Sequence, residues 1–410
     1  MKPRACLRFA AASCALALFI GCTTAPQRPT PPTPAQPTVT PTPPAPPPPP
    51  PLLRYEPVAW NNLPGWATDD TRAAWPALLT SCRSTRLAQA WNAFCAAARA
   101  LDARDAAAQR ALLESRLRPY RIITESQDGQ LTRRDRGLIT GYYEPLLKGS
   151  RVRGGVFQTP LYGVPDDLVT IELGDLYPAL KGERLRGRLQ GKRVTPYPER
   201  AQLADGKLLA GKELVWIDSP IDAFFLQIQG SGRVQLPDGS MVRLAFADVN
   251  GQPYRAIGRY LVDRGELTAE QVASLNMRRW LAEHPERQRE VFNFNPSVVF
   301  FREEKIIDPA LGPNGALGLP LTAGRSLAID PRQLPLGAPL FLATAHPLTG
   351  EPVQRLMFGQ DTGGAIRGAL RADFFWGLGP DAGAIAGSMR HDGSLWLLWP
   401  ADQPLPVPGS

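Results

Sequence analysis

A glycine-rich segment near the C-terminus holds the residue types that acid–base chemistry on a sugar needs. Residues 359–387 contain two carboxylates, Asp361 and Asp373, with the basic Arg367 between them and an aromatic cluster at 374–376. Glycines let a backbone approach a ligand closely, carboxylates donate and accept protons, and aromatic rings offer flat faces on which sugars stack. Because few structural needs gather all three kinds of residue, this segment is the first candidate for a catalytic site.

Two other segments share a pattern in which an apolar stretch runs into a polar, glycine-containing turn. They are residues 140–145 and 227–233. Taken alone, each is most simply a hairpin without a chemical role, and the pattern predicts strands at 138–147 and 223–236. Together with the aspartate segment, they predict a groove to which all three contribute.

Several other chemistries lack the residues that they require. The chain has three histidines, none at metal-ligand spacing, so we expect no metal site and no cofactor. Ser231 lacks the first glycine of a nucleophile elbow, and no phosphate loop or dinucleotide fingerprint occurs. Asp361 begins an Asp-Thr-Gly triplet like that of aspartic proteases, but those enzymes need two facing triplets and this chain has one.

The N-terminus predicts export and lipid attachment. A positively charged start precedes an apolar run at 9–20, too short for a comfortable transmembrane helix, and the run ends in Phe-Ile-Gly-Cys at Cys22. This is typical of a lipoprotein signal peptide over residues 1–21, with Cys22 as the lipidated first residue; an ordinary signal peptide with an incidental cysteine is the alternative. In the lipoproteins that this start resembles, an Asp directly after the cysteine often marks retention in the inner membrane. Thr23 at that position therefore favours the outer membrane, with the rest of the chain in the periplasm.

Residues 22–53 form the predicted lipidated cysteine and a tether in which prolines dominate. Such a composition cannot bury a core and favours extended polyproline II structure. The tether would therefore carry a folded region from the membrane to a target at some distance.

Two cysteines, Cys82 and Cys95, remain outside the signal and the predicted anchor. Because an exported protein folds under oxidising conditions, we expect a disulfide between two helical segments, with two buried free thiols as the alternative. The formal net charge is +8, of which the signal carries three positive charges. The remaining excess is spread along the chain and suits an anionic polymer, while the compartment excludes nucleic acid.

The pattern of apolar residues predicts a mainly β protein with N-terminal helices. Residues 66–118 read as helical, and Pro119 ends that stretch. From residue 127 onward, short strands alternate with Gly and Pro turns, as is typical of barrels, and a second helical patch interrupts them at 254–289.

Taken together, these motifs resemble the lytic murein transglycosylase A family. The similarity runs from about Thr140 to the C-terminus and is carried by residues 140–145, 229–232, 295–301, 324–328, 335–339 and 359–377. The resemblance implies a double-psi β-barrel with an inserted smaller β-domain. The barrel would combine a helical part with its first strand (54–148) and a C-terminal part (291–410), and the insert would span 149–290.

The resemblance also implies a glycan groove between the two domains and roles for residues along it. Asp373, just before the aromatic cluster, matches the family's catalytic aspartate, and Asp361 matches the aspartate of its Asp-x-Gly-Gly turn. For Asp361, a role in shaping the loop is equally compatible with the sequence. Arg367 stands where the family has a lysine. The implied substrate-binding residues are Thr140, Tyr142, Gln229, Gly230, Ser231, Gly232, Arg367 and Gly377.

The implied activity is that of a peptidoglycan lytic exotransglycosylase, a lyase of cell-wall turnover. It cleaves the MurNAc-β-1,4-GlcNAc bond without water and forms 1,6-anhydro-MurNAc ends. Two alternatives stay open: a glycoside hydrolase in which Asp361 activates water, and a non-catalytic wall-binding lipoprotein. The implied partners are peptidoglycan glycan strands, the outer membrane through the lipid anchor, and cell-wall synthesis proteins.

Overall fold

The computed structural model describes residues 51–84, 88–126, 132–180 and 184–407. The predicted signal peptide, the lipidation site Cys22 and nearly all of the predicted tether lie outside these residues. The chain divides into two units, 1–47 and 48–410, and the second is the one described below. Within the described residues, no helix combines the length and the apolar composition that crossing a membrane requires.

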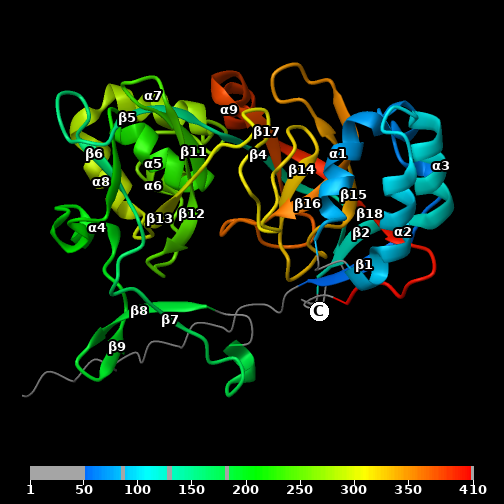
Figure 1. Cartoon of the computed structure of the whole chain (residues 1–410), viewed down its shortest axis with the longest axis horizontal. Helices are drawn as coiled ribbons and strands as arrows, with labels where there is room; N and C mark the ends of the chain where they lie inside the picture. The colour runs from blue at the N-terminus through cyan, green and yellow to red at the C-terminus, as the bar shows by residue number, and fades with distance from the viewer. Residues whose placement is uncertain (1–50, 85–87, 127–131, 181–183, 408–410) are drawn as a thin grey trace, which may run out of the picture. The chain divides into compact units, whose positions relative to one another are not determined.

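The larger sheet has nine strands, and six of them form a closed ring (Figure 1). Its order is β1-β2-β18-β15-β16-β14-β17-β4, with β3 beside β2. Because β18 also pairs with β4, the strands β4 and β14 to β18 close on themselves. The strands are β1 (Leu52–Pro57), β2 (Leu117–Glu125), β3 (Arg133–Arg134), β4 (Gly137–Glu144), β14 (Ser326–Ile329), β15 (Pro339–Ala345), β16 (Pro352–Asp361), β17 (Ala372–Leu378) and β18 (Arg390–Pro400). β1 thus begins within the last two residues assigned to the tether.

Three helices pack beside this sheet: α1 (Thr71–Ser81), α2 (Ala88–Ala100) and α3 (Ala106–Arg116). Asp70 and Asp105 accept hydrogen bonds from backbone N–H groups in the first turns of α1 and α3, which have no partner within the helix. Large apolar side chains of the helices, such as Trp75 and Leu113, join the main hydrophobic core of the ring. The chain contains a disulfide between Cys82, which ends α1, and Cys95 on α2.

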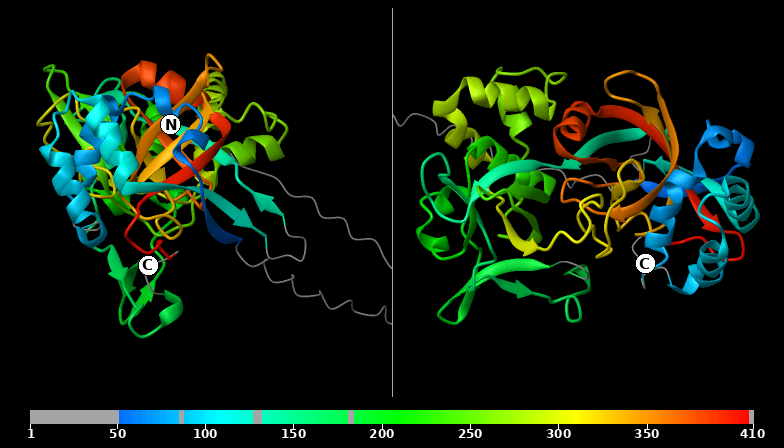
Figure 2. Two further views of the ribbon diagram at one scale, coloured as in Figure 1. Left: turned by 90° about the vertical axis from the view of Figure 1, so that its right-hand side faces the viewer. Right: turned by 45° about the horizontal axis from the view of Figure 1, so that its top comes forward.

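A second sheet of six strands has the order β13-β12-β11-β5-β10-β6. Its strands are β5 (Leu146–Ser150), β6 (Thr159–Tyr162), β10 (Glu213–Ile217), β11 (Ser231–Gln235), β12 (Met241–Val249) and β13 (Val299–Glu304). The predicted insert spans 149–290, but the first strand of this sheet along the chain, β5, begins before that range, and the last, β13, lies after it. A separate three-stranded sheet comprises β7 (Val169–Ile171), β8 (Leu185–Gln190) and β9 (Arg193–Thr195) (Figure 2).

Further helices accompany the second sheet and the end of the ring. They are α4 (Arg200–Leu203), α5 (Pro220–Gln229), α6 (Ile257–Asp263), α7 (Ser274–Glu283), α8 (Gln288–Phe294) and α9 (Gly379–Ser388). Helices α6 and α7 lie within the helical patch predicted at 254–289, and α8 begins at its end and continues to Phe294. Short 3-10 helices lie at Trp60–Asn62, Trp66–Thr68, Pro178–Leu180, Lys207–Leu209 and Pro285–Arg287.

The strand predicted at 223–236 is wrong over most of its length. Residues Pro220–Gln229 form helix α5, and only the end of the segment forms β11. Ser219 caps the helix through its side chain, Pro220 occupies the first turn, and Gly230 ends it with a φ of 82°. Because α5 is buried between the second sheet, through Ala223 and Leu226, and helices α6 to α8, through Phe224 and Phe225, its run of apolar residues carries no clear helical period. The caps are the signal that distinguishes it from a strand.

A buried ion pair joins the start of α1 to the ring. Asp69 and Arg325 are both more than nine-tenths buried, and two guanidinium nitrogens of Arg325 donate to the Asp69 carboxylate at 2.9 and 3.0 Å. The backbone N–H of Leu356 on β16 donates to the same carboxylate at 2.7 Å. Arg325 also donates to the carbonyls of Leu356 and Asp70. Removing the acid would therefore leave a buried guanidinium without its counter-charge and a buried N–H without its acceptor.

We expect Asp69→Ala to lower the free energy of unfolding by about 3–5 kcal/mol because the Arg325 charge stays buried. Asp70→Ala is the matched control, since Asp70 is an exposed N-cap whose loss costs about 1 kcal/mol. Urea denaturation of both variants measures the difference. Equal losses for the two variants would show that the Asp69–Arg325 pair does not join α1 to the ring.

Candidate active site

Five residues occupy consecutive positions in one row across the ring. The register pairs Asp361 on β16 with Ala328 on β14, Ala328 with Asp373 on β17, Asp373 with Thr140 on β4, and Thr140 with Arg390 on β18. Since neighbouring strands lie about 4.8 Å apart, the two aspartates are separated by a single intervening strand. The row therefore brings together carboxylates that are 12 positions apart in the sequence with a threonine more than 200 positions away.

Alternation along β17 decides which side chains face this row. Ala372 and Phe374 belong to the main core, whereas Phe375 packs in a separate cluster with Tyr142 and Ala328. Successive residues of a strand point to opposite faces, so Asp373 shares its face with Phe375. The Tyr142 and Phe375 rings lie 5.2 Å apart between centroids. The half-buried carboxyl of Asp373 is thus flanked by apolar rings.

A hydrogen-bond chain orients the Asp373 carboxyl. Arg371 Nη2 donates to Thr140 Oγ1 at 2.7 Å, and Thr140 Oγ1 donates to Asp373 Oδ1 at 2.5 Å. A guanidinium group can only donate, so the threonine oxygen accepts from Arg371 and uses its single hydrogen for Asp373. It follows that a protonated Asp373 carries its own hydrogen on Oδ2.

Opposing effects set the acidity of Asp373. Burial raises the pKa of its carboxyl above the ordinary value, while the Arg371 charge and the Thr140 hydrogen bond act to lower that pKa, and the net change is upward. Burial disfavours the charged form of a carboxyl, and a nearby cation favours it. The site thus keeps Asp373 protonated to a higher pH than a free aspartate while holding a cation near its ionised form.

Asp361 is held on both carboxylate oxygens. Tyr142 Oη donates to Oδ2 and the backbone N–H of Ala316 donates to Oδ1, each at 3.0 Å. Burial raises the pKa of Asp361 to about 6, although these two hydrogen bonds and one from the Thr362 N–H act to lower it. Burial also raises the pKa of Tyr142, which remains a neutral donor. Asp361 thereby ties Tyr142 and the loop around Ala316 to the end of β16.

The turn at residues 227–233 lies against β4. The Tyr143 N–H donates to Gln229 Oε1 at 3.1 Å, which joins the end of α5 to the strand that carries Thr140 and Tyr142. Ser231 is half-buried, whereas Gly232 is buried, and a Cβ added to Gly232 would lie 2.4 Å from Leu226. The structure therefore shows a packing reason for Gly232.

Two predicted binding residues have local contacts. Arg367 is exposed, and its Nη1 donates to the carbonyls of Gly363 and Ile366 in its own loop. Gly377 has a φ of 112°, and a Cβ there would lie 2.9 Å from the Ala323 side chain. The structure brings Thr140, Tyr142, Asp361 and Asp373 together, while Arg367 contacts neither carboxylate.

Arg371 is the residue that the sequence reasoning missed. It stands two positions before Asp373, so in a strand the two side chains share a face. That spacing was the available signal. The sequence analysis predicted Arg367 instead, because Arg367 lies nearer to Asp361 along the chain.

We expect Asp373 to titrate above its ordinary range, and Arg371→Gln to raise its pKa further because the lowering effect of the cation is removed. Arg367→Gln is the matched control and should leave the titration unchanged, since Arg367 binds its own loop. Carbon-13 NMR of the aspartate carboxyls against pH measures both variants. A downward shift in Arg371→Gln would contradict the arrangement.

Comparison with known proteins gives two domain matches. The MltA specific insert domain matches residues 138–302, and the 3D domain matches residues 325–399. Membrane-bound lytic murein transglycosylase A of Escherichia coli K12 is 34% identical over 267 residues, which make up 63% of this chain and 65% of that protein. The match thus spans just under two thirds of the relative's length.

Solved structures resemble the chain over more of its length. MltA from Neisseria gonorrhoeae in a monoclinic form is 35% identical with a TM-score of 0.72, and the match covers 86% of this chain and 94% of that one. Lytic transglycosylase LtgG of Burkholderia pseudomallei is 43% identical with a TM-score of 0.56, over 86% and 98%. E. coli MltA with bound chitohexaose is 27% identical with a TM-score of 0.63, over 85% and 94%.

Proposed function

Because this chain belongs to the lytic murein transglycosylase A family, we propose that it cleaves the MurNAc-β-1,4-GlcNAc bond of peptidoglycan without water. The observation that carries the proposal is Asp373, whose carboxyl has a raised pKa and is oriented by the Arg371–Thr140 chain. The neighbouring structure of E. coli MltA was solved with chitohexaose, a β-linked sugar oligomer. Its presence supports a glycan as the substrate class.

In the proposed reaction, Asp373 acts twice. The protonated acid first gives its hydrogen from Oδ2 to the glycosidic oxygen as the C1–O bond breaks. The resulting carboxylate, stabilised by the Thr140 hydroxyl and the Arg371 charge, then takes the proton of the substrate's C6 hydroxyl. That oxygen attacks C1 and closes a 1,6-anhydro ring, so one residue serves as acid and then as base.

Asp361 is better suited to positioning than to activating water. A hydrolase that inverts its substrate needs a second carboxylate free to bind water on the opposite face of the sugar. Both oxygens of Asp361 already accept protein hydrogen bonds, from Tyr142 and Ala316. Asp361 would therefore hold Tyr142 and the loop around Ala316 in place, and the hydrolase is the less favoured alternative.

We also propose the barrel, the inserted domain and the glycan groove that the family resemblance implies. The closed six-strand ring would be a double-psi β-barrel, with residues 54–148 and 291–410 around an insert at 149–290. Its support is the parallel pairing of β4 with β17 and of β14 with β16 inside one closed ring. Glycan would contact Thr140, Tyr142, Arg367, Gly377 and residues 229–232.

The proposed location is the outer membrane, as a lipoprotein whose catalytic domain lies in the periplasm. Its support is the Phe-Ile-Gly-Cys sequence that ends at Cys22, followed by the proline-rich stretch. The E. coli relative is described as membrane-bound. A lipid on Cys22 would tether the enzyme while the extended segment lets it reach the wall.

We expect Asp373→Asn to abolish release of glycan from purified sacculi, because the amide keeps the shape and loses the transferable proton. Asp381→Asn, the same change at an exposed position of α9, is the matched control and should retain activity. With the unaltered chain, the rate should fall as the pH rises through the Asp373 pKa. Mass spectrometry of the soluble products measures the activity of both variants and the pH dependence of the unaltered chain.

The products distinguish the proposed lyase from the alternatives. Released muropeptides should end in 1,6-anhydro-MurNAc, be one water lighter than hydrolysed equivalents and take up no label from heavy-oxygen water. Labelled reducing ends as the main product would instead establish a hydrolase, with Asp361→Asn then as damaging as Asp373→Asn. No glycan release across neutral and mildly acidic pH would support a wall-binding protein.

We expect Cys22→Ala to release the chain from membranes without lowering its specific activity on sacculi. The reason is that the predicted anchor and the folded region are separated by the proline-rich stretch. Membrane fractionation by density gradient measures the first effect. Unchanged sedimentation with outer membranes would show that another feature anchors the chain.

A further inference from the structure

The three-stranded sheet of β7, β8 and β9 projects from the rest of the folded region (Figure 1 and Figure 2). Its polar side is the one that contacts the second sheet. On β8, the Arg186 guanidinium pairs with Asp248 on β12 at 2.7 Å, and both side chains are more than four-fifths buried. A Cβ added to Gly251, just after β12, would lie 2.5 Å from the Arg186 Cβ, so the two backbones are close there. Because successive residues of a strand point to opposite faces, Leu185 and Leu189 lie on the outward face of β8.

The outward face is apolar across the three strands. Ile171 on β7 pairs with Leu185, Val194 on β9 pairs with Leu189, and Val169 on β7 lies between these two pairs. Leu189 is 62% exposed and Val194 is 48% exposed. Since these side chains follow one another across the strands, they form an exposed apolar patch, which is the kind of surface that contacts a membrane or another protein.

The patch ends at the turn between β8 and β9, which carries two cations. Lys192 and Arg193 are exposed, and among the residues that the structure describes neither has an acidic group within ion-pair distance. Residues 187–195 contain no acid. The acids that follow β7, Glu172 and Asp175, lie beyond the opposite end of β8, about 17 Å from the turn, because β7 and β8 are antiparallel. The turn therefore combines apolar side chains with unopposed positive charge.

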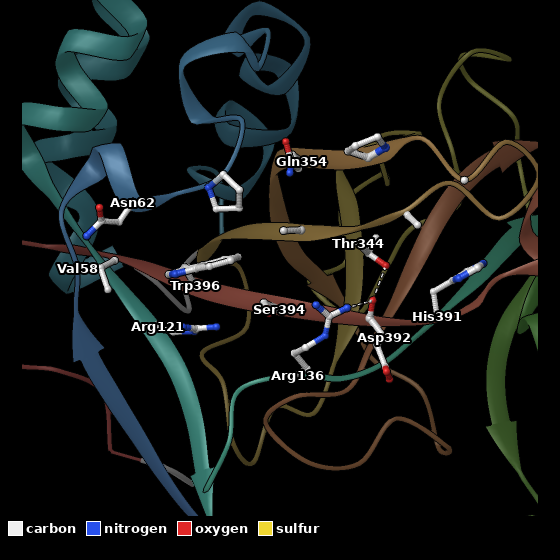
Figure 3. A pocket seen from close by; sticks show the side chains of 15 residues that line it. Val58, Asn62, Arg121, Arg136, Thr344, Gln354, His391, Asp392, Ser394 and Trp396 are labelled. Carbon is white, nitrogen blue, oxygen red and sulfur yellow. Dashed lines mark hydrogen bonds between the residues drawn. The ribbon is translucent and has the colours of Figure 1, made fainter.

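The cavity of about 1030 Å³ beside β18 lacks this combination (Figure 3). Two arginines line it, and both lie next to acids. Arg121 pairs with Asp135 at 2.6 Å, and Arg136 lies beside Asp392, to whose carbonyl it donates at 3.4 Å. An anionic partner is therefore attracted to the turn between β8 and β9 rather than to this cavity.

The size and the charge of the turn fit a bilayer better than a protein. A stable protein interface buries about 800 Å² on each partner, from roughly 20 residues. A bilayer surface needs only a few apolar side chains at the level of the headgroups and cations that meet the lipid phosphates. The lipid proposed on Cys22 would keep the chain at such a surface. Because attachment raises the effective concentration of the turn at the membrane, a weak contact there would be well populated.

We propose that the turn between β8 and β9 is a second membrane contact that binds anionic phospholipid. Leu189 and Val194 enter the headgroup region, and Lys192 and Arg193 pair with lipid phosphates. The contact holds the folded region against the bilayer, a role that goes beyond the proposed cleavage and rests on the proposed location.

Flotation with vesicles tests the contact apart from the anchor. The chain tested spans residues 23–410, which keep every described sheet and lack the predicted signal and lipid site. We expect it to bind vesicles of phosphatidylethanolamine with phosphatidylglycerol and not vesicles of phosphatidylcholine. Lys192→Gln together with Arg193→Gln should lower the partition coefficient about thirtyfold, at roughly fivefold for each cation. Leu189→Ser should lower it about tenfold or more because burial of the leucine is lost.

Arg279→Gln together with Arg289→Gln is the matched control. These two arginines are exposed on α7 and α8, so the pair of changes removes the same net charge at a different place and should leave vesicle binding unchanged. Equal losses in the two double variants would show that net charge rather than the turn attracts lipid, and would overturn the proposal.

A fluorophore at the turn shows which part of the chain meets the lipid. Leu189→Cys adds the single free thiol of residues 23–410, because Cys82 and Cys95 are joined. An environment-sensitive dye on that thiol should shift its emission to the blue when anionic vesicles are added. No vesicle binding, or binding without the shift, would overturn the membrane contact. Self-association of the unaltered chain that Leu189→Ser abolishes would overturn it too and assign the patch to a second copy.

Activity on purified sacculi separates this contact from the proposed function. The Lys192→Gln, Arg193→Gln double variant should release glycan at the unaltered rate, which also shows that it is folded. Vesicle binding by a chain that releases no glycan would support the membrane contact and overturn the proposed cleavage alone.

Discussion

The placement of β17 between β14 and β4 is the constraint on which the site depends. Its antiparallel register with β14 and its parallel register with β4 put Asp373 opposite Ala328 and Thr140. A slip of one residue would turn Asp373 toward the core and Phe374 outward. Closure of the ring by β4 and β18 leaves β4 no free edge along which to slip. The hydrogen bonds of the backbone thereby define the surroundings of the carboxyl.

Those surroundings balance two opposing electrostatic requirements. An acid that protonates a leaving oxygen needs a raised pKa, and burial among Tyr142 and Phe375 supplies it. The carboxylate left after proton transfer needs a partner, and the Thr140 hydroxyl with the Arg371 guanidinium behind it supplies one. Because the cation contacts Asp373 through a hydroxyl, its lowering effect is smaller than that of burial, and the acid stays protonated to a higher pH.

A buried ion cluster links β4 to the second sheet. Glu144, at the end of β4, is 1% exposed and accepts hydrogen bonds from Arg233 on β11 and Arg243 on β12. Both arginines also donate to the Leu311 carbonyl. Removing one member of such a cluster leaves a buried charge unpaired, so the cluster favours one arrangement of these segments over others. The strand that positions Thr140 is therefore held at both ends, by ring closure and by this cluster.

The sequence alone determined the chemistry that is available: two aspartates among glycines and aromatics, an even cysteine pair, and a lipoprotein-like start. These follow from residue type and local spacing, which need no knowledge of distant contacts. The strand predicted from the sequence at residues 223–236 was wrong, because α5 is buried on several sides and its apolar residues therefore show no clear helical period. Only the tertiary structure decided that Arg371, and not Arg367, hydrogen-bonds to the threonine that donates to Asp373. It also decided that each oxygen of Asp361 accepts a hydrogen bond from the protein. Those facts depend on strand register and burial, which arise from pairing segments that lie hundreds of residues apart.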